Sequence, residues 1–536
     1  MSNNFKKGID RMVWVHTAPA PNAHAAGQGM ASDLRNDDSR NPFAYQLVSA
    51  ATLNRYNFKT KGWGFVVNPG LTGTFGAGAG SVFAPSHALT GTISAGTTTS
   101  VTLSTALPTA VGVNMLANRG GSGDFGYRIR ITSVAAGKVE ERWITGNTDG
   151  TTPVVNVDTA FTFTPTSGDT YEILSGRVFM LSAGTLAAGC WRSFEVGANT
   201  LASKTQTNLP ATIGTDFSAV CLDEMYVPYD MKPGEGLIAG SGTYDPSGVS
   251  KRCLVATAAA STTLTGQASG GDAVIAANEY RNFQIRIVED TTNKTAVGQR
   301  RIIASHTGGA SPVYTLGAAW TVTPSANAKY VIENPNLIVL WSSAGTTTYT
   351  YNYGTATVNN GTNSIAADAW STTYFAARGS AMAAGCTSFP SFGIEPDSAR
   401  NARHSFVFSF RGGGTSLDLL DIAGAITGSW SDAIVYGGSG ASFSTGTSGK
   451  YAPCDQEGRF GYANVYFASQ LNQIRRFDVK NRVLSAFTPT DWIQSGTATA
   501  GDRLATFCAI DGTDKYTVVL LNMHLSTVVD ELIVQI

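Results

Sequence analysis

The sequence predicts an all-β protein, on three observations. Apolar and polar residues alternate with a period of two in runs such as 127–132, 283–288 and 405–410, which places one face of an extended strand in a core and the other in solvent. Clusters of Gly, Ser, Thr, Asn and Asp separate such runs, as at 147–150 and 305–309, and glycine supplies the positive φ that tight turns require. Segments with helical periodicity are scarce, because the abundant Thr and Gly oppose helix.

The middle of the chain contains an internal duplication. The run Tyr-Arg-Ile-Arg-Ile at 127–131 recurs as Phe-Gln-Ile-Arg-Ile at 283–287, and Phe-Thr-Phe-Thr-Pro at 161–165 recurs as Trp-Thr-Val-Thr-Pro at 320–324. The offset grows between the two runs, which places the added residues in the intervening hairpin, where insertions are tolerated. We expect two copies of one small β-sandwich or barrel, whose cores contain large aromatic side chains: Phe161 and Tyr171 in the first copy, Trp320 and Tyr330 in the second.

Outside the duplication, the chain repeats a hairpin that displays polar residues at its turn and a large apolar residue after it, at 53–63, 192–201, 417–430 and 474–484. This pattern resembles the outer hairpin of a kelch-like propeller blade. The resemblance implies a propeller-like body with two inserted β-modules; a string of β-sandwich domains is the alternative. The corresponding division is an N-terminal arm and first blade at 1–70, modules at 71–174 and 237–334, and further blades at 175–236 and 335–536.

Composition narrows the function classes. The 536 residues include 59 glycines, only 14% are charged, and the net charge is -1, whereas ordinary globular chains are about 25% charged. The balanced charge lacks the basic footprint of a nucleic-acid binder, and no apolar run indicates a signal peptide or a membrane-spanning helix. We therefore expect a protein that is made in the cytosol and does not associate with a membrane. Because subunit contacts are depleted in charged residues, the low charge predicts a homo-oligomer.

Catalytic and metal-binding patterns are missing from the sequence. The six histidines and six cysteines lack ligand spacing, 120–123 only approaches a serine-nucleophile motif, and the Gly-rich run 73–80 has no P-loop lysine. We therefore expect neither an enzyme nor a cofactor. One acidic and aromatic segment stands out, and its paired carboxylates suit either sugar chemistry or a loop rim. We interpret it as a subunit contact formed by Asp223, Glu224, Tyr226, Tyr229 and Asp230.

The duplicated pattern of an Ile-Arg-Ile strand, an Arg-x-Ile strand and Trp-Thr-Val-Thr-Pro resembles a short β-domain of virion structural proteins of tailed bacteriophages. A propeller-like body carrying such domains is similar to nozzle-type tail proteins, which form rings. The resemblance implies a tail or neck component in the virion, assembled in the host cytoplasm with copies of itself and other virion proteins. The protein would contact nucleic acid only where nucleic acid passes through the ring, near the basic cluster at 475–482.

An alternative is a carbohydrate-binding protein that recognises a host receptor, or one that decorates the capsid. The aromatic run 349–353 and Trp370 support sugar binding, because aromatic rings can stack on sugar rings. The sequence leaves the position in the particle open among nozzle, collar, baseplate and head decoration.

Overall fold

A computed structural model describes residues 11–535 with gaps. The described residues exclude 23–28, 33–42, 50, 68–69, 71–79, 86–87, 109–110, 118–126, 183, 186–187, 199, 205–206, 210–211, 214–216, 225–253, 267–275, 384–385, 391–394, 398–401, 405, 414, 436, 439–447, 457–462, 470–472, 479–482, 488–502, 511–515 and 524–528.

The body is a propeller, in which the described residues form six blades of four antiparallel strands each. The first three blades are β2 (Met30–Ser32), β3 (Phe43–Ser49), β4 (Thr52–Asn57) and β5 (Gly62–Val67); β6 (Gly80–Ala84), β13 (Arg177–Leu181), β15 (Trp191–Glu195) and β16 (Thr200–Ser203); and β18 (Phe217–Cys221), β26 (Leu337–Ser342), β27 (Tyr349–Asn352) and β30 (Ala369–Ser371). The fourth is β31 (Thr387–Pro390), β34 (Phe406–Phe410), β35 (Ser416–Asp421) and β36 (Ser429–Val435).

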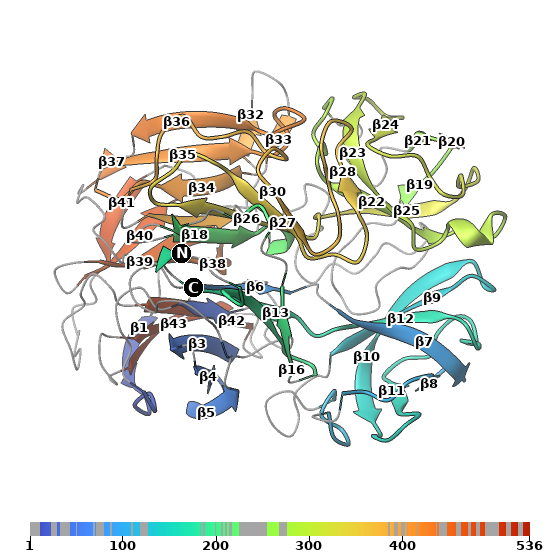
Figure 1. Ribbon diagram of the computed structural model, residues 1–536, viewed down its shortest axis with the longest axis horizontal. Coiled ribbons are helices and arrows are strands. Elements are labelled where there is room, and N and C mark those ends of the chain that lie inside the picture. Colours follow the sequence, from blue (N-terminus) through green and yellow to red (C-terminus); the bar gives the residue numbers. More distant parts are fainter. Residues whose placement is uncertain are drawn as a thin grey trace, which may run out of the picture.

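The fifth blade is β38 (Ser448–Gln456), β39 (Ala463–Ser469), β40 (Gln473–Asp478) and β41 (Val483–Phe487), with β37 (Gly437–Gly438) parallel to β41. The sixth is β42 (Arg503–Ile510), β43 (Tyr516–Met523), β44 (Val529–Gln535) and β1 (Arg11–His16). The first strands β2, β6, β18, β31, β38 and β42 contact one another in that order, and β42 contacts β2. The blades therefore close into a ring (Figure 1).

The two ends of the described chain close this ring. β1 pairs with β44 along its whole length, from Arg11 opposite Gln535 to His16 opposite Asp530, so the last blade takes its outer strand from the beginning of the chain. Blade 1 adds a polar tie, because Glu531 accepts hydrogen bonds from the Tyr56 hydroxyl and the Lys61 ammonium group, both at 2.6 Å.

Strand composition explains which strands lie inside the blades. β26, with the sequence Leu-Ile-Val-Leu-Trp-Ser, is buried at every position, since both faces of this inner strand are covered by neighbouring sheets. Short accessory hairpins project from the blades: β14 (Gly184–Thr185) with β17 (Thr212–Ile213), β28 (Val358–Asn359) with β29 (Ser364–Ile365), and β32 (Glu395–Asp397) with β33 (Ala402–His404).

Two small barrels are inserted between the first and second strands of blades 2 and 3. Barrel 1 contains β7 (Ala88–Gly96), β8 (Ser100–Leu103), β9 (Arg128–Ser133), β10 (Lys138–Asn147), β11 (Val154–Val157) and β12 (Thr170–Leu174). Its sheet runs β11-β8-β7-β12-β9-β10 and closes through β10 and β11. Figure 1 shows the two barrels on the right of the view and the blades on the left.

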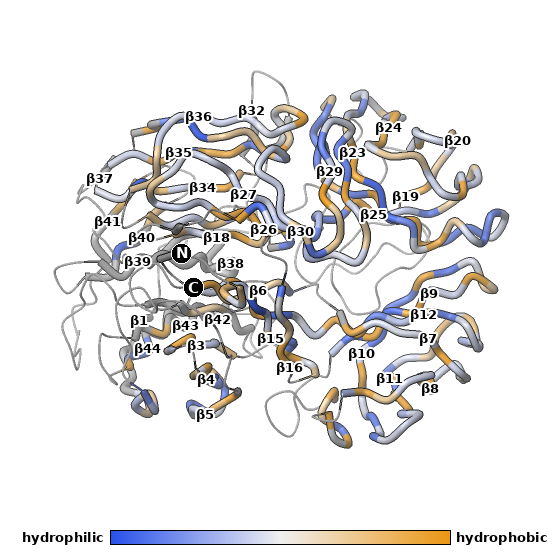
Figure 2. Tube along the Cα trace, in the orientation of Figure 1, coloured by the Kyte–Doolittle hydropathy of each residue, from blue (hydrophilic) through white to orange (hydrophobic). Residues whose placement is uncertain are grey.

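Barrel 2 repeats this closure with one interruption. Its elements are β19 (Leu254–Val255), β20 (Ala258–Ala260), β21 (Thr263–Thr265), β22 (Gln284–Glu289), β23 (Arg300–His306), β24 (Val313–Leu316) and β25 (Lys329–Glu333), with the short 3-10 helix η2 (Lys294–Ala296) before β23. β19 pairs with β25 and β20 pairs with β21, so these two short strands together take the place of β7. In both barrels hydrophobic and hydrophilic residues alternate along the strands (Figure 2).

The structure decides between the two architectures left open by the sequence: the body is a propeller with two barrel insertions, and not a string of sandwiches. One predicted boundary was wrong. β6 falls in the range assigned to the first module, 71–174, but it pairs with β13 in blade 2, where Val82 lies opposite Phe179. β1 likewise belongs to the last blade rather than to an arm before the first.

A charged interface between the barrels as the candidate functional site

The candidate site lies where the two barrels meet. On β9, Ile129 and Ile131 are buried in the core of barrel 1, while Arg128 and Arg130 point to the opposite face, as the period of a strand requires. We expected that opposite face to lie in solvent, and this was wrong, because both arginines are more than nine-tenths buried. The equivalent face of barrel 2 covers them.

Within barrel 1, two carboxylates hold the arginines of β9. Glu141, on the neighbouring β10, accepts from Arg128 Nη1 at 2.8 Å and from Arg130 Nε at 2.6 Å. Glu172, on β12, accepts from Arg130 Nη1 at 2.8 Å. Arg130 is therefore held from both sides of its strand, so its side chain has one well-defined direction.

Within barrel 2, one carboxylate gathers three donors. Glu333, on β25, accepts from Arg286 Nη2 at 3.0 Å and from Gln284 Nε2 at 3.1 Å, and Arg300 Nε lies 3.4 Å from its Oε1. Gln284 and Arg286 come from β22, the strand that corresponds to β9. Each barrel thus builds its half of the interface on the same three strands.

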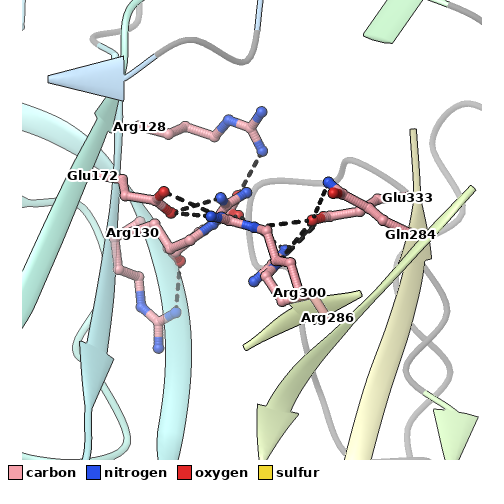
Figure 3. Close-up of polar contacts among 9 residues, drawn as sticks. Arg128, Arg130, Glu172, Gln284, Arg286, Arg300 and Glu333 are labelled. Atoms are coloured by element: carbon pink, nitrogen blue, oxygen red, sulfur yellow. Dashed lines mark hydrogen bonds and ion pairs between the residues drawn. The ribbon is translucent and has the colours of Figure 1, made fainter. Parts of the chain in front are cut away.

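Among the described residues, two ion pairs between side chains cross from one barrel to the other. Arg300 Nη2 donates to both oxygens of Glu172, at 3.1 Å and 2.9 Å. Arg286 Nη2 lies 3.9 Å from Glu141 Oε1. Figure 3 shows these side chains converging between the barrels. We call the set the charge network; it consists of Arg128, Arg130, Glu141, Glu172, Gln284, Arg286, Arg300 and Glu333.

The arginine and glutamate side chains of the charge network are ionised although most of them are buried. Burial raises the pKa of Glu172, but the nearby guanidinium groups of Arg300 and Arg130 outweigh it and lower the pKa to about 2, so this carboxylate is ionised at neutral pH. The network holds four arginines against three glutamates. A buried ion pair contributes little net stability, yet removing one partner is strongly destabilising, because the other charge is left without compensation.

Backbone contacts continue the interface beyond the charge network. Lys138 on β10 lies opposite Glu289 on β22, and the Asp290 amide donates to the Gly137 carbonyl at 2.8 Å. A Cβ at Gly137, whose φ is +69°, would lie 2.3 Å from the Asp290 carbonyl oxygen, so only glycine permits this approach. Val139 is the one barrel 1 residue in the described core of barrel 2.

The predicted aromatic core residues lie in equivalent, buried places. Tyr171 is opposite Ile131 and Tyr330 is opposite Ile287, which is the same register in the two barrels. Phe161 and Trp320 are also buried, and each ring lies under an arginine. The guanidinium carbon of Arg142 is 5.0 Å from the Phe161 centroid, and that of Arg301 is 5.5 Å from the Trp320 centroid.

The predicted subunit-contact segment is only partly described. Asp223 and Glu224 lie in η1 (Leu222–Glu224), a 3-10 helix at the point where the chain leaves β18 for barrel 2, and the Asn334 side chain donates to the Asp223 carbonyl at 3.1 Å. Tyr226, Tyr229 and Asp230 lie outside the described residues. The segment's role as a contact stays a prediction.

Most of the aromatic side chains that favoured sugar binding are in the core, and Tyr349 is half-buried against it. Tyr351, Tyr353 and Trp370 are buried between blades 2 and 3, where Tyr351 packs against Trp191 with ring centroids 5.4 Å apart. They are covered by protein and cannot stack on a sugar. Arg475, of the predicted basic cluster, is also buried.

Within the described ranges, no group of three or more His, Cys, Asp or Glu side chains is placed to hold a metal ion. In that same part of the chain, no helix has the length and apolar character needed to span a bilayer.

Comparisons with known proteins give little further information. No family model matches this chain, and no curated protein matches it in sequence. Among solved structures, a structural genomics protein of unknown function from Bacteroides thetaiotaomicron is similar over 77% of this chain and 92% of its own, with 8% identity and a TM-score of 0.21.

Proposed function

We propose that this chain is a structural component of a tailed-phage particle, a tail or neck protein that assembles as a symmetric ring with copies of itself and with other virion proteins. Its role is non-catalytic and its place is the virion. The proposal follows from the resemblance of the duplicated barrel sequence and from the propeller that carries the two barrels.

One observation supports the assembly role most directly. The chain has only 37 basic and 38 acidic residues, and seventeen of them have buried side chains in the described part of the structure. Their burial inside one subunit leaves the surface even poorer in charge than the sequence suggests. Monomeric proteins normally keep a surface of about 25–35% charged residues, whereas the cores of subunit contacts are depleted in them.

The alternative of carbohydrate binding has less support, because Tyr351, Tyr353 and Trp370 are buried in the blades. Capsid decoration shares the assembly argument and differs only in the position within the particle.

Electron microscopy of the purified protein tests the proposal. We expect class averages with rotational symmetry and an interface of more than about 2,000 Å², as obligate assemblies bury. Phe65, on the outer strand of blade 1, is the most exposed of the large apolar side chains described, at 65%, so Phe65→Glu should weaken self-association, while Lys59→Glu in the adjacent turn serves as the control. A protein that sediments as a monomer at every concentration would contradict the assembly role.

A further inference from the structure

The two barrels meet through charge, although each has an apolar core of its own. The core of barrel 1 is continuous with blades 1 and 2, and that of barrel 2 with blades 3 and 4. Val139 is the only side chain of barrel 1 that enters the described core of barrel 2. Separating the barrels would therefore expose mainly ionic side chains, which water solvates well, and would leave both apolar cores intact.

The barrels also differ in how the propeller holds them. Barrel 2 is tied along its flank to blade 4: the Asn282 side chain donates to the carbonyls of Ile422 and Ala425, at 2.6 Å and 3.2 Å, and Arg281 donates to Ala423 at 3.3 Å. In barrel 1, Val113 and Met115 are exposed in the turn before β9, and residues 118–126 lie outside the described residues. Among the described residues, barrel 1 is held by the apolar core that it shares with blades 1 and 2 and by its contacts to barrel 2.

We propose that the charge network is a latch: it holds barrel 1 against barrel 2, and when one of its carboxylates is neutralised, barrel 1 swings away as an intact unit while barrel 2 stays on blade 4. The groups that face one another are Arg128 and Arg130 of β9, Glu141 of β10 and Glu172 of β12, against Gln284 and Arg286 of β22, Arg300 of β23 and Glu333 of β25. Lys138, Glu289 and Lys294 lie at the margin.

The charge balance makes the latch asymmetric. The network already has one more arginine than glutamate, so loss of a carboxylate leaves four arginines against two, while loss of an arginine leaves three against three. Barrel 2 carries Gln284 where barrel 1 carries Arg128, so the duplicated fold already accepts glutamine in place of an arginine at this position. Glu172 is the carboxylate that accepts from Arg300 across the interface, so neutralising Glu172 should open the latch, and Arg128→Gln should leave it closed.

Hydrogen exchange on the full chain tests this directly, because the Asp290 amide donates across the interface to Gly137. In Glu172→Gln, we expect the amide of Asp290 to exchange at least about tenfold faster than in the wild type, while the core amides of β9 and β22 keep their protection. In Arg128→Gln, the Asp290 amide should exchange at the wild-type rate.

A disulfide across the interface provides the matched control. A Cβ at Gly298 would lie 3.9 Å from the Cβ of Thr132, within the range of about 3.5–4.5 Å that disulfides span. Gly298 has a φ of +80°, so Gly298→Cys strains the backbone in both redox states, and the comparison is between the oxidised and the reduced protein. Thr132→Cys with Gly298→Cys, added to Glu172→Gln, should give slow exchange when oxidised and fast exchange when reduced.

Three results would overturn the latch. The first is wild-type exchange at Asp290 in Glu172→Gln. The second is simultaneous loss of protection in the barrel cores, which would mean unfolding rather than parting. The third is fast exchange that persists in the oxidised cross-linked variant.

Discussion

Trp320, the large aromatic side chain in the core of barrel 2, can be replaced in two ways whose effects on the free energy of unfolding should differ. Trp320 is 5% exposed, and an aromatic side chain of this kind buries roughly 150–250 Å². At about 25 cal/mol per Å² this amounts to about 4–6 kcal/mol, which falls to about 3–5 kcal/mol when the compactness of the unfolded chain is included. Trp320→Ala should lower the free energy of unfolding by that amount.

Trp320→Phe should cost much less, for two reasons. Barrel 1 already places Phe161 at the equivalent position under Arg142, so the barrel accommodates a phenyl ring beneath its arginine. The Trp320 indole N–H has no hydrogen-bond acceptor among the described residues, so its removal relieves an unpaired buried donor, which offsets part of the lost contact. We expect a change of no more than about 1 kcal/mol.

Urea unfolding followed by far-UV circular dichroism measures both variants without relying on the tryptophan itself. Arg301 donates to the Ala319 carbonyl and to the Thr321 hydroxyl, at 2.7 Å and 3.0 Å. Neither acceptor belongs to the indole ring, so the comparison isolates the ring. If Trp320→Phe destabilised the protein as much as Trp320→Ala, then Phe161 and Trp320 would not be equivalent, and the prediction from the duplication would be wrong.

Three further predictions concern charge, ring closure and thiols. The pKa of Glu172 is lowered from 4.5 to about 2 in the folded protein, so its stabilising contribution is complete above about pH 4.5 and is lost as the pH falls toward 2. In Glu172→Gln, the midpoint of unfolding should therefore depend less on pH between about 4.5 and 2 than in the wild type. Lys61→Met removes the cation from the buried Glu531 carboxylate and should lower the free energy of unfolding by about 1–3 kcal/mol, as measured by thermal unfolding. An unchanged stability would show that closure of the propeller does not depend on this ion pair. Cys386 is a buried free thiol, so Cys386→Ser should change stability by about 1–3 kcal/mol, and an interchain disulfide at this position on non-reducing gels would contradict its assignment.

Much of the fold could be predicted from local sequence, because strands and turns depend on neighbours along the chain. The alternation of Ile129 and Ile131 with arginines located β9, and the recurrence of the pattern at Ile285 and Ile287 located β22. The boundary of the first module could not be predicted this way. β6 is assigned to blade 2 by its pairing with β13, almost one hundred residues later in the chain, and no local pattern reports such a pairing.

The candidate site was missed because a polar face was equated with a solvent face. That rule holds for a sheet with one covered side, and it fails where a second copy of the same face is available to cover the first. A signal was nevertheless present. When the two copies are aligned, Glu141 corresponds to Arg300 and Leu174 to Glu333, so the copies differ in charge at the positions where their faces meet.

One of these differences favours the packing of the two copies against each other. Two copies of the barrel 1 face would bring Glu141 of one barrel, at the position of Arg300, toward Glu172 of the other, and like charges in a buried interface repel. With Arg300 at that position, Glu172 meets a guanidinium group instead, 2.9 Å away, and Glu333 supplies Arg286 with a carboxylate. Divergence after duplication has therefore made the two faces complementary to each other rather than to themselves, and this favours pairing within one chain over pairing between equivalent barrels of two chains. If the chain assembles as proposed, the contacts between subunits then have to come from other surfaces than the faces of the charge network.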